Sequence, residues 1–238
     1  MSMQPRQRML LGFVLANSVI AAVAALLVLT RPTPPPQIQG VLLPQARALA
    51  PFELTDHRGK KFSNRDLEGH WHLVSYGFTT CPDICPATLA ELASFRSQVT
   101  PELRSDLKIL FYSVDHRRDT PGQLASYVSF FDADFTGLTA TEGEEAAAAA
   151  FASSLGIMSV LEPAEGTTLD EGDYQVGHGV TLLLLNPDGK LQAVLQPGLV
   201  DAQGFPGFDI GTLLRDYARI RAHLAAAGKA IHAPGQDV

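Results

Sequence analysis

Residues 72–98 read HLVSYGFTTCPDICPATLAELASFRSQ, an apolar run followed by two cysteines and then by a helical repeat. The apolar run, residues 72–78, has the length and composition of a buried β-strand. Apolar residues recur at helical spacing after Pro86, so a helix is predicted over residues 86–98. The proline costs no hydrogen bond there, because N–H groups of the first helical turn have no partner within the helix. The segment therefore predicts a strand that leads through the cysteines into a helix.

The rest of the body alternates between strand and helix patterns. A hairpin with its turn at residues 56–59 is followed by strands predicted at residues 72–78, 107–114, 180–185 and 191–195. Helices are predicted over residues 86–98, 121–131, 141–155 and 208–227, with Thr120 and Thr141 as N-caps and Glu144 at a capping-box position. This order predicts an α/β fold: a thioredoxin-like mixed sheet flanked by helices, with an N-terminal hairpin and a helical insertion.

The N-terminus predicts a membrane anchor. Residues 9–29 form a 21-residue run without charge, which at about 1.5 Å per residue matches the hydrocarbon thickness of a bilayer. Arg6 and Arg8 precede the run and favour a cytoplasmic N-terminus, residues 1–8. A cleaved signal peptide is the alternative, but the run is longer than a typical signal core and ends in LLVL, a poor cleavage site. We therefore expect an uncleaved transmembrane helix that precedes the soluble domain.

The remaining boundaries follow from composition. Four prolines between residues 32 and 36 predict a semi-rigid Pro-rich linker over residues 30–48. The soluble domain is expected to span residues 49–227, and residues 228–238 are expected to be a flexible tail. The resulting expectation is a single-pass protein of the cytoplasmic (inner) membrane whose soluble domain lies in the periplasm.

The charge distribution excludes several classes of partner. The 238 residues carry a formal net charge of −7, yet residues 1–36 contain three arginines and no acid. The body is therefore strongly acidic, which argues against nucleic-acid binding and against adsorption to anionic lipid. Only two cysteines are present, Cys81 and Cys85, and a pair so closely spaced cannot staple a fold.

The two cysteines lie where a strand meets a helix N-terminus. Partial positive charge and free N–H groups there favour the thiolate form, and spacing of four residues places both sulfurs on one side of a turn. Two soft thiolates suit Cu(I). His178 is the candidate third ligand, because the loop before the strand at residues 180–185 faces the cysteine helix in a thioredoxin-like sheet. Two readings stay open: a lone histidine is more often structural, and the cysteines also form a candidate redox pair.

Three motifs resemble the Sco/SenC family of membrane-anchored copper chaperones for cytochrome c oxidase assembly. Residues 77–86 match the pattern GFTxCPDICP, residues 112–121 resemble VSxDPxRDTP, and residues 174–189 are similar to YxVDH…DPxG. The resemblance covers roughly residues 50–222. It implies that Cys81, Cys85 and His178 bind one copper per chain, as Cu(I) with Cu(II) as a second state.

The resemblance also implies the partners. The chain would take copper from an upstream donor protein and deliver it to, or maintain, the binuclear copper centre of cytochrome c oxidase subunit II. Such a metallochaperone has no turnover of its own and no catalytic residue. The main alternative is a thiol–disulfide oxidoreductase that reduces the cysteines of that subunit, with Cys81 and Cys85 as its redox pair. A thiol peroxidase and a structural zinc site fit less well, since no arginine can be tied to the cysteines and zinc needs four ligands.

Three departures from the family pattern stand near the site. His116 replaces a proline, Gly177 an acid or amide, and Gly179 a serine or threonine. The glycines predict a more flexible loop around His178 and a weaker copper site. Of the remaining polar residues, none is assigned to the site: His70 and His72 are expected on a sheet edge, Asp115 and Arg118 as a local ion pair, Tyr174 in the core and Asp83 at the helix N-terminus.

Overall fold

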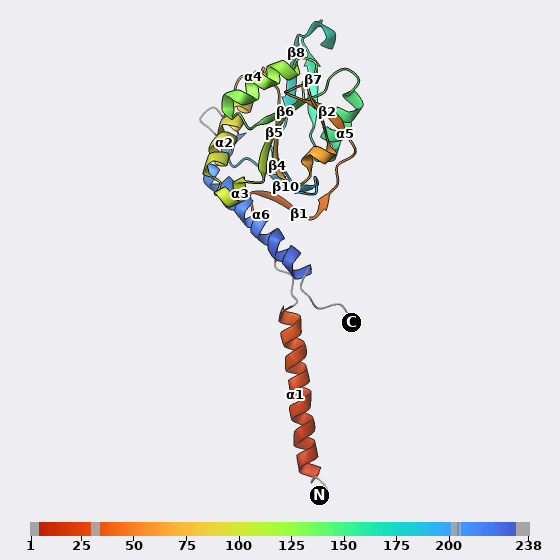
Figure 1. Cartoon of the computed structure of the whole chain (residues 1–238), viewed down its shortest axis with the longest axis vertical. Coiled ribbons are helices and arrows are strands. Elements are labelled where there is room, and N and C mark those ends of the chain that lie inside the picture. The colour runs from red at the N-terminus through yellow and green to blue at the C-terminus, as the bar shows by residue number, and fades with distance from the viewer. Residues whose placement is uncertain (1–4, 30–33, 201–203, 205, 232–238) are drawn as a thin grey trace. The chain divides into compact units, whose positions relative to one another are not determined.

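The computed structural model of the chain describes residues 5–29, 34–200, 204 and 206–231 (Figure 1). It divides into two compact units, residues 36–222 and a second unit that contains residues 1–35 and 223–238. Helix α1, Pro5–Leu29, includes the predicted anchor segment. Over the residues described, none of the helices meets the length and hydrophobicity that a membrane span requires.

The larger unit is built around one eight-stranded sheet with the order β1-β10-β9-β4-β5-β6-β2-β3. Strands β4, β5 and β6 are parallel, and every other pair is antiparallel. The strands of this sheet are β1 (Gly40–Arg47), β2 (Glu53–Asp56), β3 (Lys61–Ser63), β4 (Trp71–Gly77), β5 (Leu107–Ser113), β6 (Thr136–Thr139), β9 (Leu182–Leu185) and β10 (Leu191–Leu195). The predicted mixed α/β sheet is confirmed.

Helices cover both faces of this sheet (Figure 1). On one face Phe95 and Trp71 pack against Tyr217, at ring-centroid distances of 5.8 and 6.5 Å. On the other face Phe151 packs against Phe52 and Tyr112, at 4.6 and 5.0 Å. The helical elements are α2 (Ile84–Gln98), α3 (Pro101–Arg104), α4 (Pro121–Phe131), α5 (Glu145–Leu155) and α6 (Ile210–Ile231), with short 3-10 turns η1 (Asn64–Leu67) and η2 (Leu169–Glu171).

Two predicted boundaries are wrong. Residues 40–47, expected in the linker, form the edge strand β1 and pair with β10. The sequence after the proline cluster contains apolar residues that suit a strand, and an edge strand tolerates Pro44. Helix α5 begins at Glu145 rather than after Thr141, because Gly143 adopts a left-handed backbone conformation with φ 86°, although the Glu144 carboxylate accepts the predicted capping-box hydrogen bond from the Thr141 N–H. Residues 228–231 of the predicted tail are helical, whereas residues 1–4, 30–33 and 232–238 lie outside the described residues.

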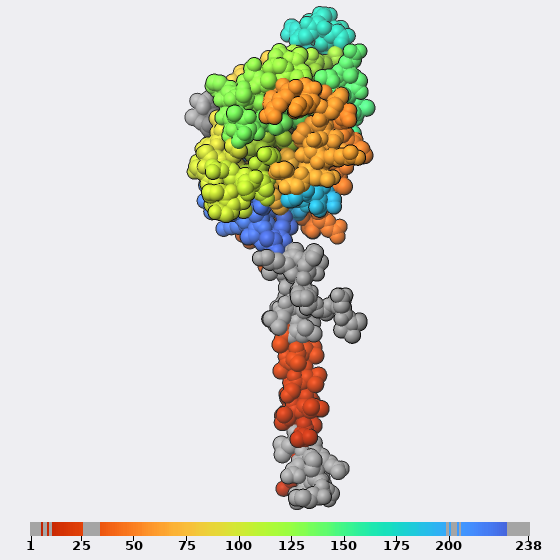
Figure 2. Space-filling model, in the orientation of Figure 1, coloured from red at the N-terminus to blue at the C-terminus, as the bar shows by residue number. Residues whose placement is uncertain are grey.

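Strand β6 of the main sheet was not predicted, and neither were β7 and β8, which form a separate hairpin. Strand β7, Ser159–Pro163, pairs with β8, Tyr174–His178, and neither belongs to the eight-stranded sheet. The hairpin lies at the margin of the larger unit, and its tip protrudes in the space-filling view (Figure 2). In a second two-stranded ribbon, β11 (Leu199–Val200) pairs with β12 (Pro206–Gly207). The hairpin carries His178 at its end, so its placement decides where that side chain points.

His72 is buried rather than exposed at a sheet edge. Its strand β4 is paired on both sides, its side chain is 2% exposed, and its Nδ1 has no hydrogen-bond partner among the described residues. Burial lowers the pKa of His72 from 6.5 to about 4, with smaller effects from His70 and Lys108. The imidazole is therefore neutral in the folded chain at neutral pH.

This burial predicts acid sensitivity. Between pH 6.5 and about 4 the unfolded chain binds a proton at His72 that the folded chain does not, so stability is lost as the pH falls through this window. Lowering the pH from 7 to 5 should cost about 2 kcal/mol of unfolding free energy through this residue. Urea unfolding of wild type and His72→Leu at both pH values measures the effect. An equal pH dependence in both proteins would show that another group is responsible.

Candidate metal centre

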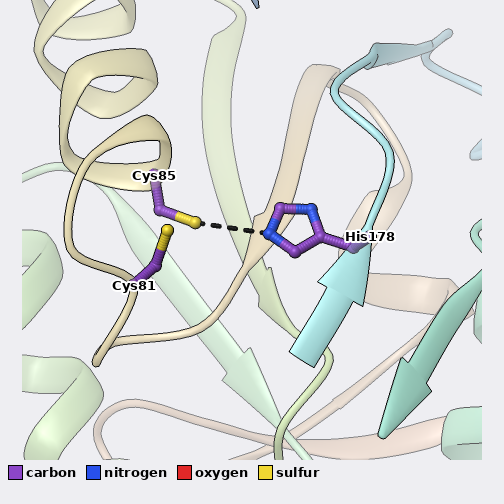
Figure 3. Close-up of side chains that lie close together, drawn as sticks. All are labelled: Cys81, Cys85 and His178. Atoms are coloured by element: carbon purple, nitrogen blue, oxygen red, sulfur yellow. Dashed lines mark hydrogen bonds between the residues drawn. The ribbon is translucent and has the colours of Figure 1, made fainter. Parts of the chain in front are cut away.

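The structure brings Cys81, Cys85 and His178 together from two distant parts of the chain (Figure 3). Cys81 lies in the loop between β4 and α2, Cys85 in the first turn of α2, and His178 at the end of β8. Their ligand atoms all lie within 4.8 Å of one another, and His178 Nε2 is 3.5 Å from Cys85 Sγ. Among the described residues, this is the only group of three or more Cys, His, Asp or Glu side chains so arranged.

A backbone hydrogen bond orients the imidazole of His178. Its Nδ1 lies 2.8 Å from the carbonyl oxygen of Gly179, which can only accept, so Nδ1 carries the proton. Nε2 is then left with a free lone pair on the side of the cysteines. The rings of Tyr76 and Phe78 contact the imidazole edge-on, each at 5.8 Å between centroids. The Nε2 atom of His178 therefore faces the two sulfurs and can act as a nitrogen ligand beside them.

Gly77 allows the close approach of Cys85 to the end of β4. A Cβ atom at residue 77 would lie 2.4 Å from Cys85 Sγ, far inside van der Waals contact. Any side chain there would displace the sulfur or the strand. The glycine of the GFT motif thus has a steric role at the site.

The two thiols differ in acidity. The pKa of Cys81 is lowered, first by the hydrogen bond from the Cys85 thiol and also by the N–H groups of Asp83 and Cys85 at the start of α2. The pKa of Cys85 is raised, because its proton is held by the Cys81 sulfur and because the side chain is buried. Cys81 is half-buried and Cys85 buried. The reduced pair therefore presents one accessible thiolate, Cys81, beside one buried thiol.

The buried carboxylate of Asp119 is hydrogen-bonded to the loop that leads to Cys81. Asp119 accepts hydrogen bonds from the N–H and hydroxyl of Thr79, at 2.9 and 2.6 Å, and from the Ser113 hydroxyl at 2.7 Å. Burial raises the pKa of Asp119, and these bonds oppose that shift. Asp119 lies within the RDTP motif, but its role could not be predicted from the sequence because its partners are 40 and 6 residues away.

Comparison with known proteins identifies the family. The family model described as SCO1/SenC matches residues 42–203. The chain belongs to the SCO1/SenC family. A relative in Stutzerimonas stutzeri, named "Putative copper-binding protein", is 40% identical over 163 residues, which cover 68% of this chain and 76% of that protein. The mitochondrial SCO1 homolog of Homo sapiens is 36% identical over 146 residues, which cover 59% of this chain and 44% of that protein. The chain thus spans about half the length of the mitochondrial SCO relatives.

Solved structures of the SCO1/SenC family share this fold. Arabidopsis thaliana ScoI with copper bound is 29% identical with a TM-score of 0.60, and the match covers 73% of this chain and 98% of that chain. BsSco, described as a member of the Sco family of cytochrome c oxidase assembly proteins, is 23% identical with a TM-score of 0.51 over 76% and 98% of the two chains. The second likeness is one of fold alone. The thioredoxin-like fold expected from the sequence is therefore shown.

Packing explains part of the differences between this chain and the family pattern at residues 116, 177 and 179. A Cβ at residue 179 would lie 3.1 Å from the hydroxyl of Tyr76, so glycine suits the tight contact there. Gly177 lies opposite Val160 in the β7–β8 ribbon. His116 is not part of the metal group; its Nδ1 is buried without a hydrogen-bond partner among the described residues. Nothing in the structure explains that substitution.

The other polar residues singled out in the sequence divide into two groups. Asp83 occupies the N-cap position of α2, but its side chain makes no capping hydrogen bond. Asp115 and Arg118 form the expected ion pair, and Tyr174 joins it by donating a hydrogen bond to Asp115. Their arrangement beside β8 was not anticipated from the sequence.

Proposed function

We propose that this SCO1/SenC protein is a copper-binding metallochaperone that holds one copper ion on Cys81, Cys85 and His178. The observation that carries the proposal is the convergence of two sulfurs and one imidazole nitrogen within 4.8 Å. Two thiolates and one neutral imidazole form a donor set suited to Cu(I), and the imidazole adds a donor suited to Cu(II). The copper-binding description of one relative and the copper-bound form of another support the same reading.

The difference between the two cysteines suits a protein that must release its cargo. Cys85 is buried at the start of α2 and provides a fixed ligand, whereas Cys81 is half-exposed and can be reached by an incoming ligand. A thiolate of a recipient protein can join the copper from the exposed side as the Cys81 sulfur leaves. Copper would then move by ligand exchange, without oxidation or reduction of either protein.

The recipient we propose is cytochrome c oxidase subunit II, whose binuclear copper centre would be filled or maintained, and the donor is an upstream copper protein. The description of the Sco family as cytochrome c oxidase assembly proteins supports this choice. An N-terminal anchor would hold the domain on the periplasmic side of the cytoplasmic membrane. The uncharged run at residues 9–29 and the arginines before it support the anchor; the side chains of residues 26–29 lie outside the described part of the chain.

A thiol–disulfide oxidoreductase is the second candidate, favoured by the accessible thiolate of Cys81. Cys81 would attack a disulfide of the partner, forming a mixed disulfide and releasing one partner thiolate. Cys85 would then attack the Cys81 sulfur, which releases the second partner thiolate and leaves Cys81 and Cys85 oxidised. The described residues contain no cis peptide bond, the feature that thioredoxin-type oxidoreductases place opposite their cysteines.

An anaerobic copper(I) titration of the full-length chain in detergent tests the proposal. The reduced chain should hold about one copper per molecule against a competing chelator, and the chain with its cysteines oxidised should hold essentially none, since the thiolates are the ligands. The matched control is the same preparation after re-reduction. A reduced chain that retains no copper but exchanges disulfides readily would replace the chaperone with the oxidoreductase.

A further inference from the structure

The position of His178 depends on how the β7–β8 hairpin is attached. Within the described part of the chain its two strands pair only with each other, so no ladder of the main sheet there fixes β8 beside the cysteines. An ion pair between Arg117 and Asp170 near the hairpin tip joins two exposed side chains and contributes little. A stronger attachment lies at Tyr174, the first residue of β8.

Asp115, Arg118 and Tyr174 form a cluster at that point in which Asp115 and Tyr174 are buried and Arg118 is partly exposed. Asp115 is fully buried, accepts a hydrogen bond from the Tyr174 hydroxyl at 2.5 Å, and pairs with the Arg118 guanidinium. Arg118 also donates to the backbone carbonyl of Tyr174 at 3.3 Å and lies 4.0 Å above its ring. Burial and the bond to Asp115 raise the pKa of Tyr174 to about 12, so its hydroxyl remains a donor. Charged partners make such hydrogen bonds strong.

The cluster also reaches the metal centre through one ring. The Arg118 guanidinium lies 6.0 Å from the centre of the Phe78 ring, and that ring contacts the imidazole of His178 edge-on. Both ends of β8 are thus fixed: Tyr174 by the ion pair of Asp115 with Arg118, and His178 against Phe78. Asp115 follows the end of β5, and its N–H donates a hydrogen bond to the hydroxyl of Ser113, the last residue of that strand.

We propose that Asp115, Arg118 and Tyr174 are positioning residues that hold β8 so that the Nε2 atom of His178 stays beside Cys81 and Cys85. They are not metal ligands themselves and act through the hairpin and the Phe78 ring. The measurement of copper(I) affinity rests on the proposed function, whereas the measurement of amide hydrogen exchange does not.

Tyr174→Phe is the sharpest variant, because it removes the bond to Asp115 and keeps the ring beneath Arg118. Tyr112→Phe is the matched control: it also removes one buried tyrosine hydroxyl, which donates to the carbonyl of Ala148 within the core rather than to Asp115. Copper(I) affinity of the full-length chain should fall about tenfold in Tyr174→Phe, as for loss of a residue that orients a metal ligand, and should not change in the control.

A double-mutant cycle separates positioning from a general structural effect. If Tyr174 acts through His178, Tyr174→Phe should cause no further loss of copper affinity in a His178→Ala background. Unchanged affinity in the single variant, or an equal loss in both backgrounds, overturns the proposal.

Hydrogen exchange in the metal-free protein provides the second readout. Amides of residues 174–178 should exchange about tenfold faster in Tyr174→Phe than in wild type or Tyr112→Phe, because the hairpin opens more often. If wild type binds no copper, the proposed function fails and this readout alone decides the positioning role. Unaltered exchange in the hairpin then overturns it.

Discussion

Replacing either Cys81 or Cys85 with serine should abolish tight copper binding by the reduced chain. Each variant removes one of the two sulfurs that lie beside His178 Nε2, and a serine hydroxyl is a hard, protonated and much weaker donor for Cu(I). The copper(I) affinity should fall by more than about 100-fold. Replacing a residue that only orients a metal ligand typically costs no more than about 100-fold, and loss of a ligand should cost more. Competition with a chromophoric copper(I) chelator under anaerobic conditions measures it. Retention of wild-type affinity by either variant would remove that sulfur from the proposed site.

The same two variants should differ from each other in thiol chemistry. Cys81→Ser should react slowly with a small disulfide reagent, because the remaining thiol is buried, and burial raises its pKa even without the Cys81 sulfur. Cys85→Ser should react quickly at Cys81 and stop at a mixed disulfide, because no second thiol is present to release the reagent. Mass spectrometry of the products distinguishes the two states. The opposite order of reactivity would show that Cys85 is the attacking thiol.

Most of the central fold could be predicted from local sequence patterns. The strand at residues 72–78 and the helix after the cysteines could be predicted because a mostly apolar run is followed by proline and a helical repeat. Strand β1 was missed because a proline-rich stretch precedes it and its stability comes from pairing with β10, about 150 residues away. Strand β8 was missed because two of its five residues, Gly177 and Gln175, have little β-propensity and only the pairing with β7 makes it a strand.

The three residues of the candidate metal site could be predicted from the sequence, but the residues that hold them in place could not. Cys81 and Cys85 stand out because they are the only cysteines and flank a helix start, and His178 follows from a family motif. The roles of Asp119 and Tyr174 depend on contacts with Thr79 and Asp115, which lie 40 and 59 residues away in the chain. A polar residue bonded across such a separation leaves no periodic signal in the sequence.

Replacing His178 with alanine should separate copper binding from thiol chemistry. The variant loses the only nitrogen donor in the group but keeps both sulfurs, and the chief cause of the lowered pKa of Cys81 is Cys85 rather than His178. Copper(I) affinity should therefore fall by about 100-fold, and any Cu(II) complex should lose the magnetic signature of a bound imidazole nitrogen. The rate at which Cys81 attacks a disulfide should change by no more than about threefold, because the thiolate and its accessibility are retained.

His70→Ala is the matched control for this variant, because His70 is another histidine of the domain and is not part of the metal group. If His178→Ala keeps full copper affinity, the two cysteines bind the ion without it and the attachment of β8 has no bearing on copper. If it instead slows thiol exchange as strongly as Cys81→Ser does, His178 acts on the Cys81 thiolate rather than on a metal. Only loss of copper with retention of exchange is consistent with His178 as the third ligand, because the two reactions share the sulfurs and differ in their need for the imidazole.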